Sequence, residues 1–261
     1  MCAEFNEEKD AQMNLTILTY NINKFRNWLF KEISRNALKD LILSVNADII
    51  FLQEFSGENR KRKKIIHELE GFIDNIWSDF AYGKNSIYEG GHHGNVILSK
   101  YPIVHWENIN ISTNFLEKRG LLHARISIPF LQNNILQHNK EIDLYCLHLN
   151  PLQKGRSKQI REIIKIVSEK KLGTPFIIAG DLNDWNFKLD KIIAKDLNVI
   201  ESTLQISGAH TKTFPSFSPH LCLDRIYTRG LIPLEILKYP LDGSHLLSDH
   251  LPLAIKVSLN E

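Results

Sequence analysis

The segment 176–185, FIIAGDLNDW, begins as an apolar strand and ends in a carboxylate and an amide, Asp181 and Asn183. Taken alone, an Asp that follows a strand is most often a turn residue or the N-cap of a helix. Four further segments also bring carboxylate, amide or imidazole groups to strand ends or loops: TYNIN (19–23), FLQEF (51–55), LHLNP (147–151) and LSDHLP (247–252). Their number indicates a shared site rather than separate turns.

Two acidic residues, Glu54 and Asp181, would repel each other at neighbouring strand ends unless a hard cation lay between them. Oxygen ligands favour Mg²⁺ or Mn²⁺, because zinc prefers more His and Cys and DLNDWN lacks the Gly and Glu of a calcium loop. His148 and His250 can stabilise developing negative charge or move a proton near neutral pH. This combination predicts hydrolysis at phosphorus.

Two strand-helix-strand units are expected to position these groups. In the first, strands at 15–22 and 47–54 flank apolar residues at helical spacing between positions 29 and 45. In the second, strands at 142–149 and 175–183 flank a helix with apolar residues from 160 to 167. The four strands end in Asn21, Glu54, His148 and Asp181.

The remaining strand candidates are 94–100, 121–128, 223–228, 234–240 and 251–257. These are too many for one small parallel sheet, so we expect an α/β (α+β) fold with two sheets face to face and helices outside. The result is a four-layer α/β/β/α sandwich. No linker-like composition divides the chain, which predicts an N-terminal tail at 1–13 and one domain at 14–261.

Composition is that of an ordinary globular protein: 261 residues, 43% hydrophobic, 24% charged and a net charge of +2. This small charge excludes a global field for nucleic acid or membrane binding. Three scattered cysteines and a polar N-terminus without a signal-like apolar run predict a cytoplasmic protein, and Cys146 is expected in the core. No apolar run approaches the length of a transmembrane helix.

Six motifs in this order, TYNIN, LQE, HL, GDLND, LDRIY and SDH, resemble the deoxyribonuclease I-like, or endonuclease/exonuclease/phosphatase, superfamily. The resemblance runs from about residue 14 to 257 and implies a deoxyribonuclease I-like fold. Residues 76–103, IWSDFAYGKNSIYEGGHHGNVILSKYPI, resemble the uncharacterised bacterial YbhP-like group. That similarity indicates a subgroup and leaves the substrate open.

The resemblance implies a metal-dependent phosphoesterase in which a metal-organised water attacks phosphorus. Glu54 would be the principal ligand of Mg²⁺ or Mn²⁺, Asn21 would help to position it, and Asp249 would approach the same metal or a second one.

Catalytic roles are implied in the same way. Asp181 would orient or deprotonate the water, and Asn183 would contact a nonbridging phosphate oxygen. His148 and His250 would stabilise the phosphate charge, with Asp224 fixing the tautomer of His250. Whether Asp181 or the Asp224–His250 pair is the general base stays open.

Substrate contacts are predicted at Asn95, in the glycine-rich segment GGHHGN, at Arg119 and at Asn23. Many relatives carry an Asp at the position of Asn23, so tight binding of a second metal is not expected. The HL form at His148 resembles nuclease, sphingomyelinase and tyrosyl-DNA phosphodiesterase branches and disfavours abasic-site repair.

Nucleic acid is the expected substrate. The basic run RKRKK at 60–64 indicates an anionic partner, either nucleic acid or acidic lipid head groups. Two alternatives stay open: a hydrolase of lipid or inositol head groups, and a non-catalytic anion-binding module. Taken singly, Asp224 and Arg225 could form an ordinary surface ion pair. The sequence does not predict the oligomeric state.

Overall fold

The computed structural model describes residues 13–27, 29, 31–59, 77–114, 117–132, 135–169, 173–238 and 246–259, with the side chains of 58, 59 and 130–137 excluded. The tail at 1–12 and the basic run at 60–64 therefore lie outside the described residues. Within these ranges, no helix combines the length and the apolar character needed to cross a bilayer.

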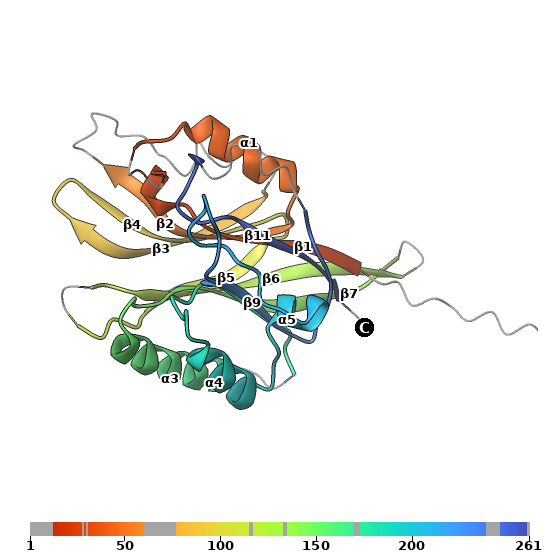
Figure 1. Ribbon diagram of the computed structural model, residues 1–261. Coiled ribbons are helices and arrows are strands. Elements are labelled where there is room, and N and C mark those ends of the chain that lie inside the picture. Colours follow the sequence, from red (N-terminus) through yellow and green to blue (C-terminus); the bar gives the residue numbers. More distant parts are fainter. Residues whose placement is uncertain are drawn as a thin grey trace, which may run out of the picture.

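Two β-sheets form the centre of the protein (Figure 1). The first has the order β10-β11-β1-β2-β4-β3, with β1 (Met13–Asn21), β2 (Ile49–Asn59), β3 (Asp79–Tyr88), β4 (Gly91–Ser99), β10 (Ile232–Ile236) and β11 (Leu253–Leu259). The second has the order β5-β6-β7-β8-β9, with β5 (Ile103–Asn110), β6 (Gly120–Gln132), β7 (Ile135–His148), β8 (Phe176–Asp181) and β9 (Asp224–Arg229).

The two predicted strand-helix-strand units lie at the centres of the two sheets. Strands β1 and β2 are parallel and joined through α1 (Arg35–Val45), and strands β7 and β8 are parallel and joined through α3 (Gln153–Glu169). Antiparallel strands flank both pairs. The predicted repeat is therefore confirmed.

Alternating residues on the central strands fill three apolar layers, because both faces of each sheet are covered. Ile17 and Phe51 point between the sheets, where they pack in one cluster with Leu144 and Ile177. On the outer face of the first sheet, Leu18 of β1 packs with residues of α1. A third cluster joins the second sheet to α3 and α4 (Lys188–Leu197), and Figure 1 shows these helices on its outer side.

These layers confirm the four-layer sandwich. The expected core position of Cys146 is also confirmed, because its side chain is fully buried between the sheets.

Some element boundaries differ from prediction. Ser34 caps α1 through its Oγ, which accepts from Ala37 N, so the helix begins at Arg35 and leaves Leu29 exposed. The strand expected at 234–240 is instead β10 at Ile232–Ile236. The strands β3 and β5 and the helices α4 and α5 (Ser202–Ser207) were not predicted. Both missed strands are sheet edges that expose apolar residues such as Ile87 and Trp106 beside polar ones, so apolar and polar residues do not alternate regularly along them.

The register of the strands aligns their polar ends. His148 pairs with Asp181 across the parallel β7–β8 ladder, and Asp181 pairs with Asp224 across β8–β9. Gly180 permits this approach, because it has φ 147° and a Cβ there would lie 1.9 Å from the carbonyl oxygen of Leu147.

Candidate active site

Asp181 is at the centre of a buried polar cluster formed by the ends of both central strand pairs. Its side chain is almost fully buried. Asn21 Nδ2 donates to Asp181 Oδ2 at 3.1 Å, which links the first sheet to the second. The backbone N–H of Asn183 donates to Oδ1 at 2.8 Å. The carboxylate is thus held in one orientation by groups from two motifs.

Two imidazoles flank this carboxylate. Nε2 of His148, at the end of β7, lies 3.5 Å from Asp181 Oδ2, and Nε2 of His250 lies 3.7 Å from the same oxygen. Both rings are buried. Segments separated by about a hundred residues therefore place two imidazoles around one carboxylate oxygen.

His250 is paired with a second carboxylate on its far side. Nδ1 of His250 donates to Asp224 Oδ2 at 2.8 Å, and Thr213 Oγ1 donates to the same oxygen at 2.6 Å. Burial lowers the pKa of His250, but the charges of Asp224 and Asp181 and the hydrogen bond to Asp224 outweigh burial and raise it to about 10. His250 is therefore an imidazolium at neutral pH.

Burial has opposite consequences for His148 and Asp181. It lowers the pKa of His148 well below the usual value, and the positive charge of Arg119 lowers it further, so this imidazole is neutral. Burial raises the pKa of Asp181 to about 7; His250 opposes this shift and Asp224 adds to it. A carboxylate with a pKa near neutrality is suited to accept a proton.

Glu54 reaches the same cluster from β2. It has φ 57° and lies where the β2–β4 register shifts between Leu52 and Phe55, a bulge that redirects its side chain. Its Oε1 is 3.8 Å from His148 Nδ1, and Lys24 Nζ forms an ion pair with Oε2. Burial opposes ionisation, but the positive charge of Lys24 and its hydrogen bond outweigh burial and lower the pKa of Glu54 to about 2.

The donor set around Glu54 fits a hard divalent cation. Burial raises the pKa of Asp249, His250 lowers it, and the negative charge of Glu54 raises it again, so Asp249 lies within electrostatic range of Glu54. The Lys24 ammonium already contacts Glu54, in the role that a cation would take. Together with the amide of Asn21, these oxygens have the chemistry that Mg²⁺ or Mn²⁺ prefers.

Lys24 was missed in the sequence, and it reaches Glu54 through an unusual turn. Asn23, Lys24 and Phe25 form the short 3-10 element η1 and all have positive φ, at 44°, 55° and 61°. The N–H of Asn23 donates to Asn21 Oδ1 at 3.0 Å. Asn23 Nδ2 is buried and has no hydrogen-bond partner among the described residues. Conformations of this kind cluster at functional sites.

Arg119 lies at the edge of the cluster. Its Nη2 donates to Glu117 Oε1 at 2.7 Å, and its charge contributes to lowering the pKa values of both His148 and His93. It also lines a pocket of about 360 Å³ together with Lys84, Asn85, Ile87, Asn108, Asn110, Ser112 and Lys118. Arg119 therefore connects the buried cluster to a basic, polar pocket.

Asn95 is placed differently from the other predicted residues. Its Nδ2 donates to the carbonyls of Gly120 at 3.2 Å and Cys146 at 3.3 Å, which ties β4 of the first sheet to β6 and β7 of the second. Both amide hydrogens are therefore committed to the backbone.

Asn183 completes the loop after β8. It has φ 52°, and its Nδ2 donates to the carbonyl of Leu149 at 3.0 Å and lies 3.5 Å from Asp181 Oδ2. Its amide therefore remains beside the carboxylate.

The surface ion pair considered for Asp224 and Arg225 is wrong. Arg225 is buried and its Nη1 lies 3.2 Å from Asp184 Oδ2, whereas Asp224 accepts a hydrogen bond from His250. Asp184 Oδ2 also accepts from the N–H of Leu189, in the first turn of α4, at 2.9 Å. The last Asp of GDLND is thus structural.

His93, in the glycine-rich segment GGHHGN, lies near the cluster. Burial lowers its pKa to about 4; Lys24 adds to this shift and Glu54 opposes it. Its Nδ1 is buried and has no hydrogen-bond partner within the described part of the chain. His92, by contrast, lies 2.8 Å from the hydroxyl of Tyr82 and has a structural contact.

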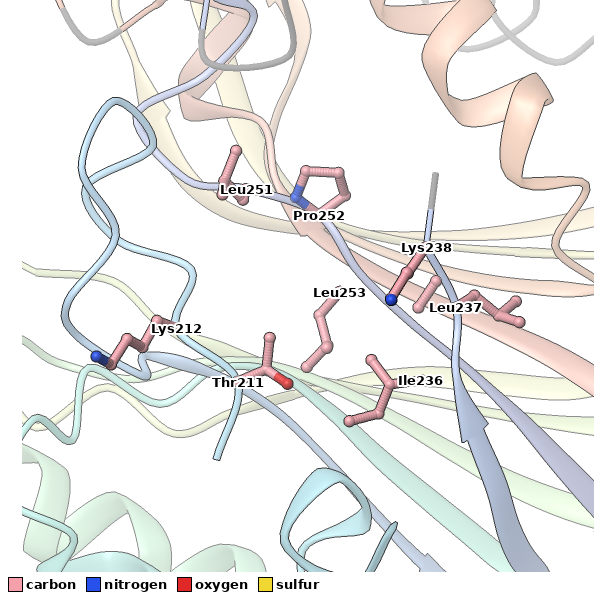
Figure 2. Close-up of a pocket in the computed structure, with 9 residues that line it drawn as sticks. Thr211, Lys212, Ile236, Leu237, Lys238, Leu251, Pro252 and Leu253 are labelled. Atoms are coloured by element: carbon pink, nitrogen blue, oxygen red, sulfur yellow. The ribbon is translucent and has the colours of Figure 1, made fainter. Parts of the chain in front are cut away.

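An apolar pocket of about 430 Å³ lies beside the segment that follows His250, but it lacks the predicted chemistry (Figure 2). Its lining is Thr211, Lys212, Ile236, Leu237, Lys238, Leu251, Pro252, Leu253 and Ala254. None of the predicted catalytic or metal-binding residues is among these, so the polar cluster is the better candidate for catalysis.

Comparisons with known proteins agree with this architecture. The profile of the Endonuclease/Exonuclease/phosphatase family matches residues 18–250. The chain is 34% identical over 258 residues to the uncharacterised protein YbhP of Escherichia coli K12, covering 97% of this chain and 99% of that protein. A YbhP from Shigella flexneri matches equally.

Solved structures share the fold at low identity. An endonuclease/exonuclease/phosphatase from Beutenbergia cavernae has a TM-score of 0.73 and 17% identity, covering 95% of this chain and 72% of that one. A humanised Danio rerio TDP2 has a TM-score of 0.69 and 17% identity, with coverages of 94% and 98%. The human Nocturnin catalytic domain has a TM-score of 0.65 and 16% identity, with 96% of each chain covered.

Proposed function

The chain belongs to the Endonuclease/Exonuclease/phosphatase family, whose members are phosphoester hydrolases, and from this we propose that it is a divalent-metal-dependent phosphodiesterase. The observation that supports this most directly is the position of Asp181. Its carboxylate lies between a neutral imidazole at 3.5 Å and an imidazolium at 3.7 Å. Such a group can take a proton from water while its neighbours stabilise negative charge.

In the proposed reaction, Asp181 accepts a proton from the attacking water, because its pKa of about 7 makes it a competent base at neutral pH. Hydrogen bonds from the side chain of Asn21 and the N–H of Asn183 hold the two carboxylate oxygens of Asp181 in a fixed orientation. The water oxygen forms the new bond to phosphorus, and the bond from phosphorus to the leaving oxygen breaks. The alternative base, the Asp224–His250 pair, is disfavoured because His250 already carries its proton.

His250 then acts as a donor. Its imidazolium Nε2–H can donate to a nonbridging phosphate oxygen or to the leaving oxygen, and Asp224 stabilises the charged ring. His148, which is neutral, can donate one hydrogen bond to the phosphate. The side-chain amide of Asn183 makes only a long contact of 3.5 Å with Asp181 Oδ2, and in the proposed complex this hydrogen is donated to the phosphate instead.

Mg²⁺ or Mn²⁺ would be held by Glu54, Asp249 and Asn21, and there it would supply charge neutralisation and a lowered pKa of water. The approach of Lys24 to Glu54 supports a cation at this position. Many relatives carry an Asp at the position of Asn23, and its negative charge would help to bind a second metal ion. Because Asn23 lacks that charge, we propose that one metal ion binds tightly.

Nucleic acid is the substrate class that we favour. The pocket beside Arg119 offers Lys84, Lys118 and several amides, which suits an extended backbone with more than one phosphate. The same charges would accept a lipid or inositol head group, so that reading remains the second candidate.

A substrate panel tests the proposal. Purified protein with Mg²⁺ or Mn²⁺ should cleave single- or double-stranded DNA or RNA, and EDTA should abolish this activity. Release of a phosphorylated head group from liposomes without cleavage of nucleic acid would favour the second candidate. Absence of turnover on nucleic acid, phospholipid and phosphomonoester alike would leave only an anion-binding module and overturn the proposal.

A further inference from the structure

A second group of metal-ligating side chains lies on β5 and β6, away from the strand ends that form the candidate active site. His105 and Glu107 come from β5 and His123 from β6, and one ligand atom from each residue lies within 4.8 Å of the others. We propose that these three side chains bind a first-row transition metal ion, with Zn²⁺ as the expected occupant.

The strand register creates this group. Ile103 pairs with Ile126, but His105 pairs with Arg125, so one extra residue of β5 is bulged out between them. Glu107 consequently lies directly opposite His123, and His105 is its neighbour on the same face. Without the bulge, Trp106 would face His123 instead. Bulges of this kind commonly redirect side chains at functional sites.

The distances suit a tetrahedral ion. His123 Nδ1 lies 3.3 Å from Glu107 Oε1, and His105 Nε2 lies 4.0 Å from the same oxygen. Ligands about 2.0 to 2.1 Å from zinc at tetrahedral angles are roughly 3.3 Å apart. One pair already has this separation, and the other needs a small movement of the exposed His105 side chain.

A buried carboxylate orients the central ligand. His123 is fully buried, and its Nε2 lies 2.7 Å from Asp143 Oδ1. Asp143 is itself held by Arg125 through Nε at 2.9 Å and Nη2 at 3.2 Å. Because a carboxylate accepts, Nε2 carries the hydrogen that points at Asp143, and Nδ1 faces Glu107. Carboxylate-histidine-metal arrangements have this geometry.

Two acceptors that face each other at 3.3 Å repel unless a positive charge lies between them. That charge is either a second proton on His123 or a metal ion. The imidazole of His105 lies beside the same carboxylate and offers a further nitrogen ligand. A proton shared between His123 and Glu107 needs no third group, whereas a zinc site needs at least three protein ligands. We therefore favour the metal.

Solvent can reach the proposed site. The side chains of His105 and Glu107 are 57% and 41% exposed, so an ion can enter and a water can fill a fourth position. Arg125 pairs with His105 across the strands, but its guanidinium contacts Asp143 and Glu141, which offset its charge. Two imidazoles and one carboxylate favour zinc over magnesium.

This site is separate from the candidate active site. Asp143 and His148 lie on the same strand, five residues and about 16 Å apart at the usual rise per residue. An ion here would join the edge strand β5 to β6 and stabilise the fold without contacting the phosphoester. The proposal therefore does not depend on the proposed catalytic function.

The test uses Co²⁺ and Zn²⁺ with metal-free full-length protein. We expect Co²⁺ to give the visible absorption of a tetrahedral site, Zn²⁺ to displace it, and one equivalent of Zn²⁺ to raise the melting temperature. His105→Ala and Glu107→Gln should each weaken this binding more than tenfold, because each removes one of the three protein ligands. Both side chains are exposed, so neither substitution should unfold the protein. His220→Ala, at an exposed histidine whose Nδ1 contacts Ser218 O, is the matched control.

Glu54→Gln separates the two sites, since it removes the principal ligand of the other metal and should leave this Co²⁺ signal unchanged. Equal Co²⁺ affinity in the wild type, His105→Ala and Glu107→Gln would overturn the proposal. Loss of the signal in Glu54→Gln alone would do the same, because it would assign the ion to the active site.

Discussion

Asp224→Asn is the substitution that best probes the electrostatics of the candidate site. It replaces one carboxylate oxygen with NH₂ and keeps the volume of the side chain. Asp224 Oδ2 accepts from His250 Nδ1 at 2.8 Å, and this carboxylate is the largest influence that raises the pKa of His250. In the variant, burial is opposed only by the more distant carboxylates, so the pKa of His250 should fall markedly.

The size of the effect follows from that pKa. A return from about 10 to the ordinary 6.5 would withdraw roughly 5 kcal/mol of preference for the imidazolium, as an upper limit. A positioned acid contributes about 10²- to 10⁴-fold to a rate, so we expect kcat to fall by that factor with little change in KM.

The assay is hydrolysis of bis-p-nitrophenyl phosphate with Mn²⁺ between pH 5 and 10. In the wild type the donor form of His250 persists up to about pH 10, and in the variant it is lost as pH rises through about 6.5. Because Asp181 must be ionised to act as the base, wild-type activity should rise through about pH 7 and persist to about pH 10, whereas the residual activity of Asp224→Asn should peak near neutral pH and decline toward pH 10. Glu201→Gln is the control, because it alters a buried carboxylate that lies 3.1 Å from His210, outside the site. Equal kcat and pH profiles in Asp224→Asn and the wild type would refute this reasoning.

Three further predictions concern the neighbours of this pair. Asp181→Asn should stabilise the protein by roughly 1 to 4 kcal/mol at pH 8, measured by urea unfolding, because burial raises the carboxyl pKa to about 7 and ionisation opposes folding. That gain should vanish below about pH 4, where both states are protonated, and a gain that persists there would contradict the cause. Lys24→Met should lower the Mg²⁺ concentration for half-maximal activity several-fold, since an ammonium that competes for Glu54 is removed; an increase would contradict this role. Arg119→Ala should raise KM for oligonucleotides about 10- to 100-fold with kcat nearly unchanged, and an unchanged KM would separate Arg119 from the substrate.

Sequence patterns could predict the centre of this fold because its parallel strand pairs are buried on both faces. Apolar runs such as those ending at Asn21 and Asp181 have no other stable placement, and polar residues at their ends then meet by topology. The edge strands β3 and β5 were missed for the opposite reason. They are partly exposed, and apolar and polar residues do not alternate regularly along them.

The candidate site was predictable where it depends on strand ends and not where it depends on turns. Lys24 reaches Glu54 only because three consecutive residues from Asn23 adopt positive φ, which no local pattern indicates. Asn95 lies in a glycine-rich segment that suggests a ligand loop, yet its amide nitrogen bonds to the carbonyls of Gly120 and Cys146. Both outcomes depend on long-range contacts.

The site formed by residues 105, 107 and 123 was also hidden in the sequence. His105 and Glu107 are two residues apart, but His123 follows on the next strand, and only a β-bulge brings it opposite Glu107. No spacing rule for metal ligands would bring these residues together.

The central claim is that Asp181 and His250 form one catalytic unit, although their motifs lie far apart in the chain. The direct measurement is the initial rate of phosphodiester hydrolysis by wild type, Asp181→Ala and His250→Ala at saturating Mn²⁺, with circular dichroism melts of each. We expect both variants to lose at least about 100-fold in rate while they retain a cooperative melt. Folded variants that keep most of the wild-type rate would contradict the account.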